Sequence, residues 1–346
     1  MALRRTGVAY FGNRTVRHVR ADMQDIAASG FDYVVHCMTE SDLIWGLESM
    51  RAVVEVSKEA GLEVHLDPWG LAGIFGGEAL SKFVAWEPQT LQVMADGTLA
   101  AGCACLWAPE LRAFIREWTD AAIDIGADQL FWDEPHWYPG DLWYYGKERG
   151  DQTYRWSCRC KTCLERFEAD YGFEMPYTFT REVELFRQSA VYDILVDIFR
   201  YASNRGVENA LCLLPHGQYY HLVNLPDWEP FVQIPGVDVF GTDPYWRVNP
   251  PLELEPYCRP NARHSRELCD RYGKRDQYWL QGYGFPKGAE HEAVQAIDIA
   301  IEEGLTDIGV WAYRACESMS RLWPGDIEAT WSTIVNALNE RKVTGK

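Results

Sequence analysis

The stretch DIGADQLFWDEP, residues 124–135, joins the end of a helical pattern to a strand through a single glycine, Gly126. The same order of helix, glycine and strand recurs at residues 59–68 (EAGLEVHLDP) and 302–313 (EEGLTDIGVWAY). Glycine commonly ends a helix because it adopts the left-handed conformation without a steric penalty. The recurrence predicts strands that alternate with helices, which is the pattern of a parallel sheet.

Short apolar or aromatic runs of the same kind are found along the whole chain. We predict eight strands, which begin at Gly7, Phe31, Gly61, Asp128, Asn209, Val237, Gln277 and Asp307. Helical periodicity occupies residues 47–61, 108–127, 181–205, 259–273, 289–304 and 325–340. Eight strands alternating with helices close a (β/α)8 TIM barrel. An open doubly wound sheet would need a G-x-G-x-x-G loop after the first strand, and YFGNRTVRHV (10–19) has none.

We therefore predict one α/β domain, a (β/α)8 barrel over residues 1–346. Its long loop insertions are predicted at about 67–107, 135–180 and 244–258, because these segments separate a strand from the next helix or strand.

Charge and composition restrict the ligand. The chain has 51 acidic residues against 33 Lys and Arg, so its net charge is −18. This balance argues against nucleic acids and anionic membranes as partners. A neutral or cationic ligand is compatible, and the flat rings of 15 Trp would suit sugar faces. A homo-oligomer is also compatible with the sequence.

The N-terminus predicts the compartment. It lacks the apolar stretch and the small-residue cleavage site of a signal peptide. No apolar run reaches the roughly 18 residues that a membrane-spanning helix requires. We therefore expect a cytoplasmic protein.

The ends of the strands carry the candidate chemistry, because the active site of a barrel forms at their carboxyl ends. Asp133 and Glu134 end the fourth strand among aromatic rings. Apolar surroundings and a neighbouring carboxylate both raise the pKa of a carboxyl group. Glu134 is therefore predicted as a general acid, which must hold its proton near neutral pH.

Other side chains at the strand ends are candidates for the same site. The further catalytic candidates are Asp133, Asp243 and Glu317. The predicted substrate-binding residues are His36, Asp67, Trp69, Trp137, His216, Tyr245, Trp246, Gln281, Tyr283, Trp311 and Arg314. Asp67 and Asp243 each precede a proline, so a simple turn is the alternative explanation for both.

Residues 156–172, WSCRCKTCLERFEADYG, carry Cys158, Cys160 and Cys163 in a C-x-C-x-x-C pattern. In a chain without a signal peptide, such cysteines indicate a metal site rather than disulfides. A closed structural zinc site needs four ligands. Cys105 and Cys103, in GCACLWAPELRAF, are the candidates for the fourth, and three chance surface thiols are the alternative.

Around residues 100–172 the sequence resembles glycoside hydrolases of the (β/α)8 clan, above all the bacterial β-galactosidases of family forty-two. The matching residues are Cys105 before LWAPELR, Glu134 in FWDEP, and Cys158, Cys160 and Cys163 before LERF. The resemblance implies that Glu134 is the acid/base residue and that these four cysteines hold a structural zinc ion.

The sequence departs from that family at two positions. Asp133 stands where the family has Asn, and Gln281 stands where the family has its nucleophilic Glu at the end of strand seven. An amide cannot form the usual glycosyl-enzyme ester. The retaining mechanism of that clan is therefore not expected here.

Three mechanisms remain for a glycosidase without that nucleophile. In an inverting mechanism, Asp243, Asp67 or Glu317 activates a water molecule. In a substrate-assisted mechanism, a 2-acetamido oxygen attacks, Asp133 orients it and Glu134 protonates the leaving group. The adjacent Asp–Glu pair is similar in this respect to that of the β-hexosaminidases. In the third, Glu317 is a displaced nucleophile.

Two other classes of protein compete with the glycosidase. A metal-dependent sugar isomerase or epimerase could bind a divalent ion with Glu134, His216 and Asp243. A non-catalytic carbohydrate-binding barrel would keep its function in a Glu134→Gln variant. The predicted partner in each case is a sugar, an oligosaccharide or a glycoside, and no organic cofactor is expected.

Overall fold

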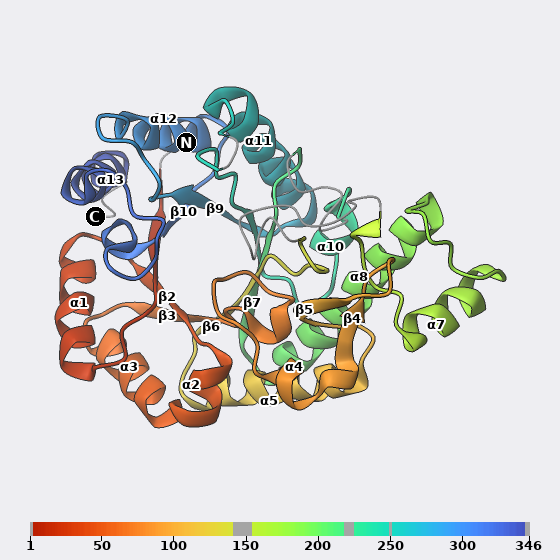
Figure 1. The fold of residues 1–346 in the computed structure, drawn as a ribbon. Helices are drawn as coiled ribbons and strands as arrows, with labels where there is room; N and C mark the ends of the chain where they lie inside the picture. Colours follow the sequence, from red (N-terminus) through yellow and green to blue (C-terminus); the bar gives the residue numbers. More distant parts are fainter. Residues whose placement is uncertain (1–2, 141–153, 218–224, 249–250, 343–346) are drawn as a thin grey trace.

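The computed structural model describes residues 3–140, 154–217, 225–248 and 251–342. Eight parallel strands form a closed barrel, as the sequence predicts, and helices surround it (Figure 1). The strands are β1 (Arg5–Tyr10), β2 (Tyr33–Cys37), β3 (Glu63–Asp67), β6 (Gln129–Asp133), β7 (Glu208–Leu213), β8 (Val239–Thr242), β9 (Arg275–Gln281) and β10 (Asp307–Trp311). Their order around the barrel is β1-β10-β9-β8-β7-β6-β3-β2, so each strand lies beside its neighbours in the chain.

The outer layer consists of helices that cross over between strands. The longer ones are α1 (Val16–Ala28), α3 (Leu47–Glu59), α5 (Pro109–Asp124), α7 (Lys161–Tyr171), α8 (Arg181–Asn204), α11 (Leu254–Tyr272), α12 (His291–Glu302) and α13 (Ile327–Arg341). Short elements lie in the loops: α2 (Glu40–Trp45), η1 (Leu71–Gly73), α4 (Phe83–Trp86), η2 (Pro88–Thr90), α10 (Glu229–Val232) and η4 (Tyr313–Cys316). The segment between β3 and α5 also contains a two-stranded antiparallel sheet, β4 (Leu91–Val93) and β5 (Leu99–Ala104).

Helix α5 shows why the sequence folds in this way. It begins at a proline in its first turn, and its buried residues, Leu111, Ile115, Trp118, Thr119 and Ala122, recur at three- and four-residue intervals. Gly126 follows with a left-handed φ of 105°, and β6 then starts. On β6 the outward Trp132 packs against Trp118, with ring centroids 5.7 Å apart. The inward Phe131 packs against Trp279 of β9 at 4.9 Å.

Polar groups close the amino-terminal half of the barrel interior. The Tyr33 hydroxyl donates to Asp307 at 2.7 Å and accepts a hydrogen bond from the Gln277 amide at 2.9 Å. The His65 ring stacks on Tyr33, with centroids 4.4 Å apart. These contacts link β2, β3, β9 and β10 beneath the site, so the barrel is a filled core rather than a pore.

Three of the longer helices differ from the sequence-based expectation, and one of them is α7, which lies in none of the predicted helical segments. Helix α1 was not predicted, because only Val19, Met23 and Ile26 of its residues are buried and no side chain caps its start. Helix α11 begins at Leu254, ahead of the expected segment 259–273, and continues through Pro260. Among the described residues, none of the helices combines the length and apolar character needed to cross a membrane.

Candidate active site

Asp133 and Glu134 both reach the mouth of the barrel, although they are neighbours in the chain. Successive residues of a strand point to opposite faces. Asp133 shares the inward phase of Phe131, and β6 ends there. Glu134 then has a φ of 42°, a left-handed conformation that is rare for a residue other than glycine. Its N–H still donates to the Cys212 carbonyl at 3.0 Å, so the change of hand occurs on an anchored backbone.

Gly76, in the long loop after β3, covers this acidic pair. Its N–H donates to the Asp133 carbonyl at 3.0 Å. A Cβ at position 76 would lie 2.3 Å from Asp133 Oδ2 and 3.0 Å from Glu134 Oε2. Both carboxyl groups therefore approach one point, and only glycine leaves them room. The same loop is joined to the segment after β10 by the Ser320 hydroxyl, which donates to Glu78 at 2.7 Å.

Asp67 and Asp243, from the ends of β3 and β8, complete a group of four acids. Asp67, Asp133, Glu134 and Asp243 are 0%, 9%, 8% and 3% exposed, so all four are buried. Burial, followed by the charge of Asp133, raises the pKa of Asp67 well above its usual range. Burial and then the charge of Glu134 do the same to the pKa of Asp133. Such a group keeps protons that exposed acids would release.

Glu134 and Asp243 interact directly. Burial raises the pKa of Glu134 well above its usual range, and the charge of Asp243 and a hydrogen bond with it add to the shift. The pKa of Asp243 is raised to about 7, mainly by burial, while its hydrogen bond with Glu134 opposes the rise. Two carboxyl groups in such contact share a proton, because both cannot ionise at once.

Aromatic rings surround the acids on the inner face of the mouth. The members of this inner group include Trp69, Tyr245, Tyr283 and Trp311, all of which the sequence analysis proposed for substrate binding. Tyr245 and Tyr283 meet edge to face at 5.4 Å. Burial and then the charge of Asp243 raise the pKa of Tyr245, which is therefore close to the acids. The site can hold a proton donor beside flat apolar surfaces.

Several candidates from the sequence lie elsewhere. His36 faces outward from β2, where its Nε2 contacts the Ser57 hydroxyl at 2.8 Å. Trp137 donates its indole N–H to the Arg187 carbonyl at 2.9 Å in the outer core. Trp246 is also in the outer core, with its indole N–H on Glu292 at 2.8 Å. These three residues belong to the packing between strands and helices.

Glu317 and Arg314 form an ion pair of 2.9 Å with each other, and Arg314 also pairs with Glu328 of α13. The Glu317 side chain is 42% exposed, so it does not belong to the buried group of acids. Gln281 is buried, but its amide binds backbone: Oε1 accepts from the Arg247 N–H at 2.9 Å, and Nε2 donates to the Tyr283 carbonyl at 3.2 Å. Gln281 thus ties the loop after β8 to the end of β9.

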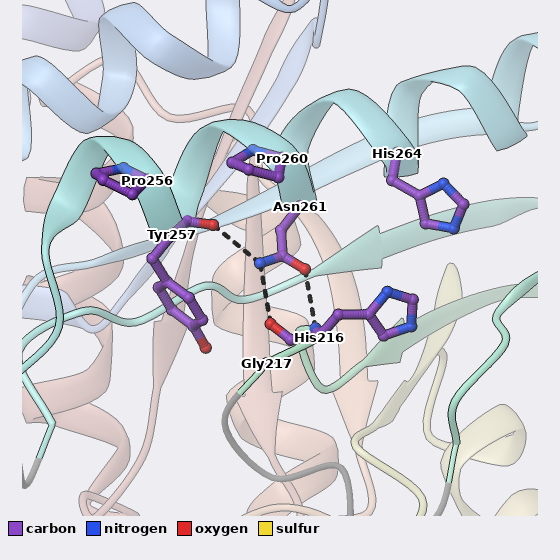
Figure 2. Close-up of a pocket in the computed structure, with 7 residues that line it drawn as sticks. All are labelled: His216, Gly217, Pro256, Tyr257, Pro260, Asn261 and His264. Carbon is purple, nitrogen blue, oxygen red and sulfur yellow. Dashed lines mark hydrogen bonds between the residues drawn. The ribbon is translucent and has the colours of Figure 1, made fainter.

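His216 lies away from these acids and lines a cavity of about 440 Å³ between the end of β7 and the first half of α11 (Figure 2). Asn261 fixes this segment, because its Oδ1 accepts from the His216 N–H at 2.8 Å. The His216 ring stacks on Trp228, with centroids 4.2 Å apart. Among the described residues, Glu134, His216 and Asp243 do not form a cluster of metal-ligand atoms. The triad suggested for an isomerase is therefore not assembled.

The four predicted cysteine ligands do come together. The sulfur atoms of Cys105, Cys158, Cys160 and Cys163 all lie within 4.8 Å of one another. Cys105 Sγ is 3.5 Å from Cys163 Sγ and 3.6 Å from Cys160 Sγ. Cys103, the other candidate for the fourth ligand, packs in a separate small cluster with Met94, Ala100 and Tyr138. None of the ten cysteines, all of which the structure describes, forms a disulfide, so this group of four could hold a metal ion.

The sequence analysis missed three inward residues, Phe11, Cys37 and Cys212. Phe11 lies between Trp69 and Trp311, with ring centroids 4.9 and 5.4 Å away. Cys37 and Cys212 are fully buried in the same inner group. Counting in steps of two along each strand would have found the cysteines, because Tyr33, Val35 and Cys37 share one phase.

No protein-family model matches the chain, and no curated protein sequence is similar to it. Solved structures are similar in fold. The catalytic domain of β-amylase from Paenibacillus polymyxa has a TM-score of 0.70 at 11% identity, over 99% of this chain and 100% of that one.

A β-galactosidase from Halorubrum lacusprofundi has a TM-score of 0.69 at 12% identity, over 97% of this chain and 58% of that one. A D-allulose 3-epimerase from Methylomonas sp. has a TM-score of 0.52 at 12% identity, over 99% of each chain. At these identities the comparisons establish the TIM-barrel fold, and the chemistry must be argued from the residues of the site.

Proposed function

We propose that the protein is a glycoside hydrolase with Glu134 as its general acid. The observation that carries the proposal is the placement of Glu134: it is buried on a left-handed backbone at the barrel mouth, in contact with Asp243. Its raised pKa keeps the proton that the leaving-group oxygen needs. The aromatic rings beside it offer faces for a sugar. β-Amylase and β-galactosidase, which share the fold, act on glycosides, and this adds to the support.

The spacing of the acids favours the substrate-assisted mechanism over the inverting mechanism and over a displaced nucleophile. Inverting glycosidases separate the acid and the base by ~6.5–9.5 Å, which leaves room for a water molecule. Glu134 and Asp243 are in hydrogen-bond contact, and the oxygens of Asp133 and Glu134 approach one point within 3.0 Å. Neither of these pairs leaves that room, so within the buried group of acids only Asp67 is left as the base of an inverting mechanism. Glu317 is too exposed and too well paired to serve as a displaced nucleophile.

We therefore favour substrate assistance. In this mechanism a 2-acetamido oxygen of the substrate attacks the anomeric carbon while Glu134 protonates the leaving group and the glycosidic bond breaks. Glu134 then takes a proton from a water molecule, which opens the resulting oxazoline ring and restores the acetamido group. Asp133 accepts the N–H of that acetamido group and orients it, while Asp243 takes part in holding the proton on Glu134. The substrate class is a glycoside or oligosaccharide with an acetamido group beside its anomeric carbon.

The test compares oligosaccharides and alkyl glycosides with and without the 2-acetamido group, because their poor leaving groups need the proton of a general acid. Glu134→Gln should lower turnover about 10²–10⁴-fold on the substrate that is cleaved, since general acid catalysis contributes that much. Glu317→Gln is the matched control and should keep near-normal activity, because that carboxylate is exposed. Proton NMR of the first product should show retention of configuration. Full activity in Glu134→Gln would remove the proposal, and inversion would remove substrate assistance.

We also propose that the four clustered cysteines hold a structural zinc ion. Zinc–sulfur bonds of about 2.3 Å in a tetrahedron place the sulfurs about 3.8 Å apart. The observed separations of 3.5 and 3.6 Å fit that geometry. The ion would join the segment before α5 to the segment before α7, and it would take no part in the reaction.

A further inference from the structure

Two cysteines lie among the acids of the candidate site, separate from the four that are clustered. Cys37 on β2 is paired in register with Asp67 on β3. Cys212 on β7 is paired in register with Asp133 on β6. Both thiols are 0% exposed and face the barrel interior. Parallel register pairs on a common face place their side chains side by side, so each thiol adjoins a carboxyl group.

These thiols are beside the acids and can supply S–H donors to them. Among the described residues, both carboxyl oxygens of Asp67 are buried without a hydrogen-bond partner, and the Cys37 thiol is beside them in register and acts on the pKa of Asp67. Cys212 interacts with both Asp133 and Asp243, which flank Glu134. Burial and the neighbouring acids raise the pKa of both thiols well above the usual range. They therefore stay as S–H groups and are poor nucleophiles.

The weakness of a thiol as a donor explains why cysteine suits these positions. A strong donor to a carboxyl group favours the ionised form and so lowers the affinity of that group for a proton. A thiol donates only weakly, so it can orient a carboxyl group and still leave it able to hold a proton. A serine hydroxyl would shift the balance toward the carboxylate.

We propose that Cys37 and Cys212 are positioning residues, which orient Asp67, Asp133 and Asp243 through their S–H groups and so govern the protonation of the acids around Glu134. This inference rests on the proposed glycosidase function. Its signature is that two changes of one thiol should act in opposite directions. Cys212→Ser strengthens the donor, whereas Cys212→Ala removes it.

The experiment measures the pH dependence of kcat/KM on the oligosaccharide or alkyl glycoside that the wild type cleaves. In the profile of kcat/KM against pH, one limb reflects the ionisation of the carboxyl groups. Cys212→Ser should move the midpoint of that limb to lower pH and Cys212→Ala should move it to higher pH, each by about half a pH unit or more. Cys269→Ala is the matched control. That cysteine is equally buried but belongs to the outer core, where its thiol faces the Phe240 carbonyl, and its variant should keep the wild-type profile.

A second measurement needs no turnover. Infrared spectroscopy can follow the protonated-carboxyl band of each variant during a pH titration, and melting temperatures show which variants are folded. Cys37→Ala provides a second folded variant, in which the band of Asp67 should titrate at higher pH.

Equal profiles for both Cys212 variants, with unchanged infrared titrations, would overturn the inference. If Glu134→Gln alone abolishes activity in that case, the proposed function survives the loss. If Glu134→Gln is fully active while the infrared titrations still shift, the reaction was wrongly assigned but the role of the thiols holds.

Discussion

At position 134 the backbone adopts a left-handed conformation, and this torsion places Glu134 beside Asp133 at the mouth of the barrel. In a regular strand Asp133 and Glu134 would point to opposite faces. The left-handed φ of Glu134 instead brings both carboxyls beneath Gly76. Such a conformation costs a non-glycine residue about 1–3 kcal/mol and persists where the surroundings impose it. Here the surroundings include the bond from the Glu134 N–H to the Cys212 carbonyl.

The raised pKa of Asp243 predicts how stability depends on pH. Its pKa is about 7 in the folded protein, against an ordinary value of 3.8. The folded state binds this proton more tightly than the unfolded chain does. The stability it contributes is therefore complete below pH ~4 and is lost as the pH rises through ~7.

Melting temperatures measured from pH ~5 to ~8 should consequently fall in the wild type, and Asp243→Asn should flatten that fall. Some slope should remain, because the pKa of Asp307, deeper in the barrel, is also raised to about 7, mainly by burial. Parallel curves for the wild type and the variant would contradict the assignment of this proton to Asp243.

Residue types at strand ends were enough to predict the acids, but not which way every side chain points. Asp67, Asp133, Glu134 and Asp243 come together as their positions suggested. His36 does not, because it has the outward phase of β2. Which residues of a strand face the barrel interior depends on the pairing register. β2 has only five residues, and their alternation is too short to predict that choice from the sequence.

Among the elements, the long loop between β3 and α5 has the closest relation to the site. Gly76 meets the acids, and Gly77 lies so near Trp69 that a Cβ there would be 2.0 Å from its ring. Glu40 of α2 anchors this loop, because its carboxylate accepts from the backbone N–H groups of Ala72 and Phe83, each at 2.7 Å. The loop therefore acts as a fixed wall of the site.

Gly76→Ala should damage this wall. The added methyl group would overlap Asp133 Oδ2, which we expect to cost about 1–3 kcal/mol of stability. Turnover should fall about tenfold or more, because a small displacement of a catalytic group has a large effect. Gly46→Ala is the control, since its Cβ would approach no atom closer than 3.4 Å. Activity and melting temperature should be measured on both variants. Equal turnover of Gly76→Ala and the wild type would contradict the claim that this loop holds the acids in place.

The element order was predictable because helix, glycine and strand recur with a clear change of period. Helix α5, Gly126 and β6 follow that pattern residue by residue. Helix α11 shows where the pattern fails: a proline inside a helix removes a hydrogen bond, so the sequence around Pro260 suggests a start rather than a middle. Packing against α12 and β8 is a tertiary effect that no local signal contains.

Across the whole molecule, the cluster of four cysteines connects distant parts of the chain. Cys105 precedes α5, and the other three cysteines precede or begin α7. Trp137, which is three residues after Glu134 in the sequence, lies nearby. Its indole N–H donates to the Arg187 carbonyl of α8. The cluster therefore lies close to Arg187, whose carbonyl binds the segment that follows β6.

Elemental analysis of the purified protein should find about one zinc ion per chain. Cys163→Ser should lose the ion and lower the melting temperature by several degrees, whereas Cys103→Ala should keep it, because Cys103 lies in a separate cluster. Chelation of the wild type should reproduce the effect of Cys163→Ser. A metal-free protein with normal stability would show that the thiols are only packed together.

The torsion at Glu134 also sets the tolerance of this position in a saturation library. Selected for soluble expression alone, the library should enrich Gly, Asn and Asp, which accept a left-handed backbone, and deplete Val, Ile and Thr, which resist it. Selected for turnover, it should retain Glu. The residue that the proposed reaction needs is thus not the one that the backbone prefers, and under the proposal, drift without selection would remove the acid before it disturbed the barrel.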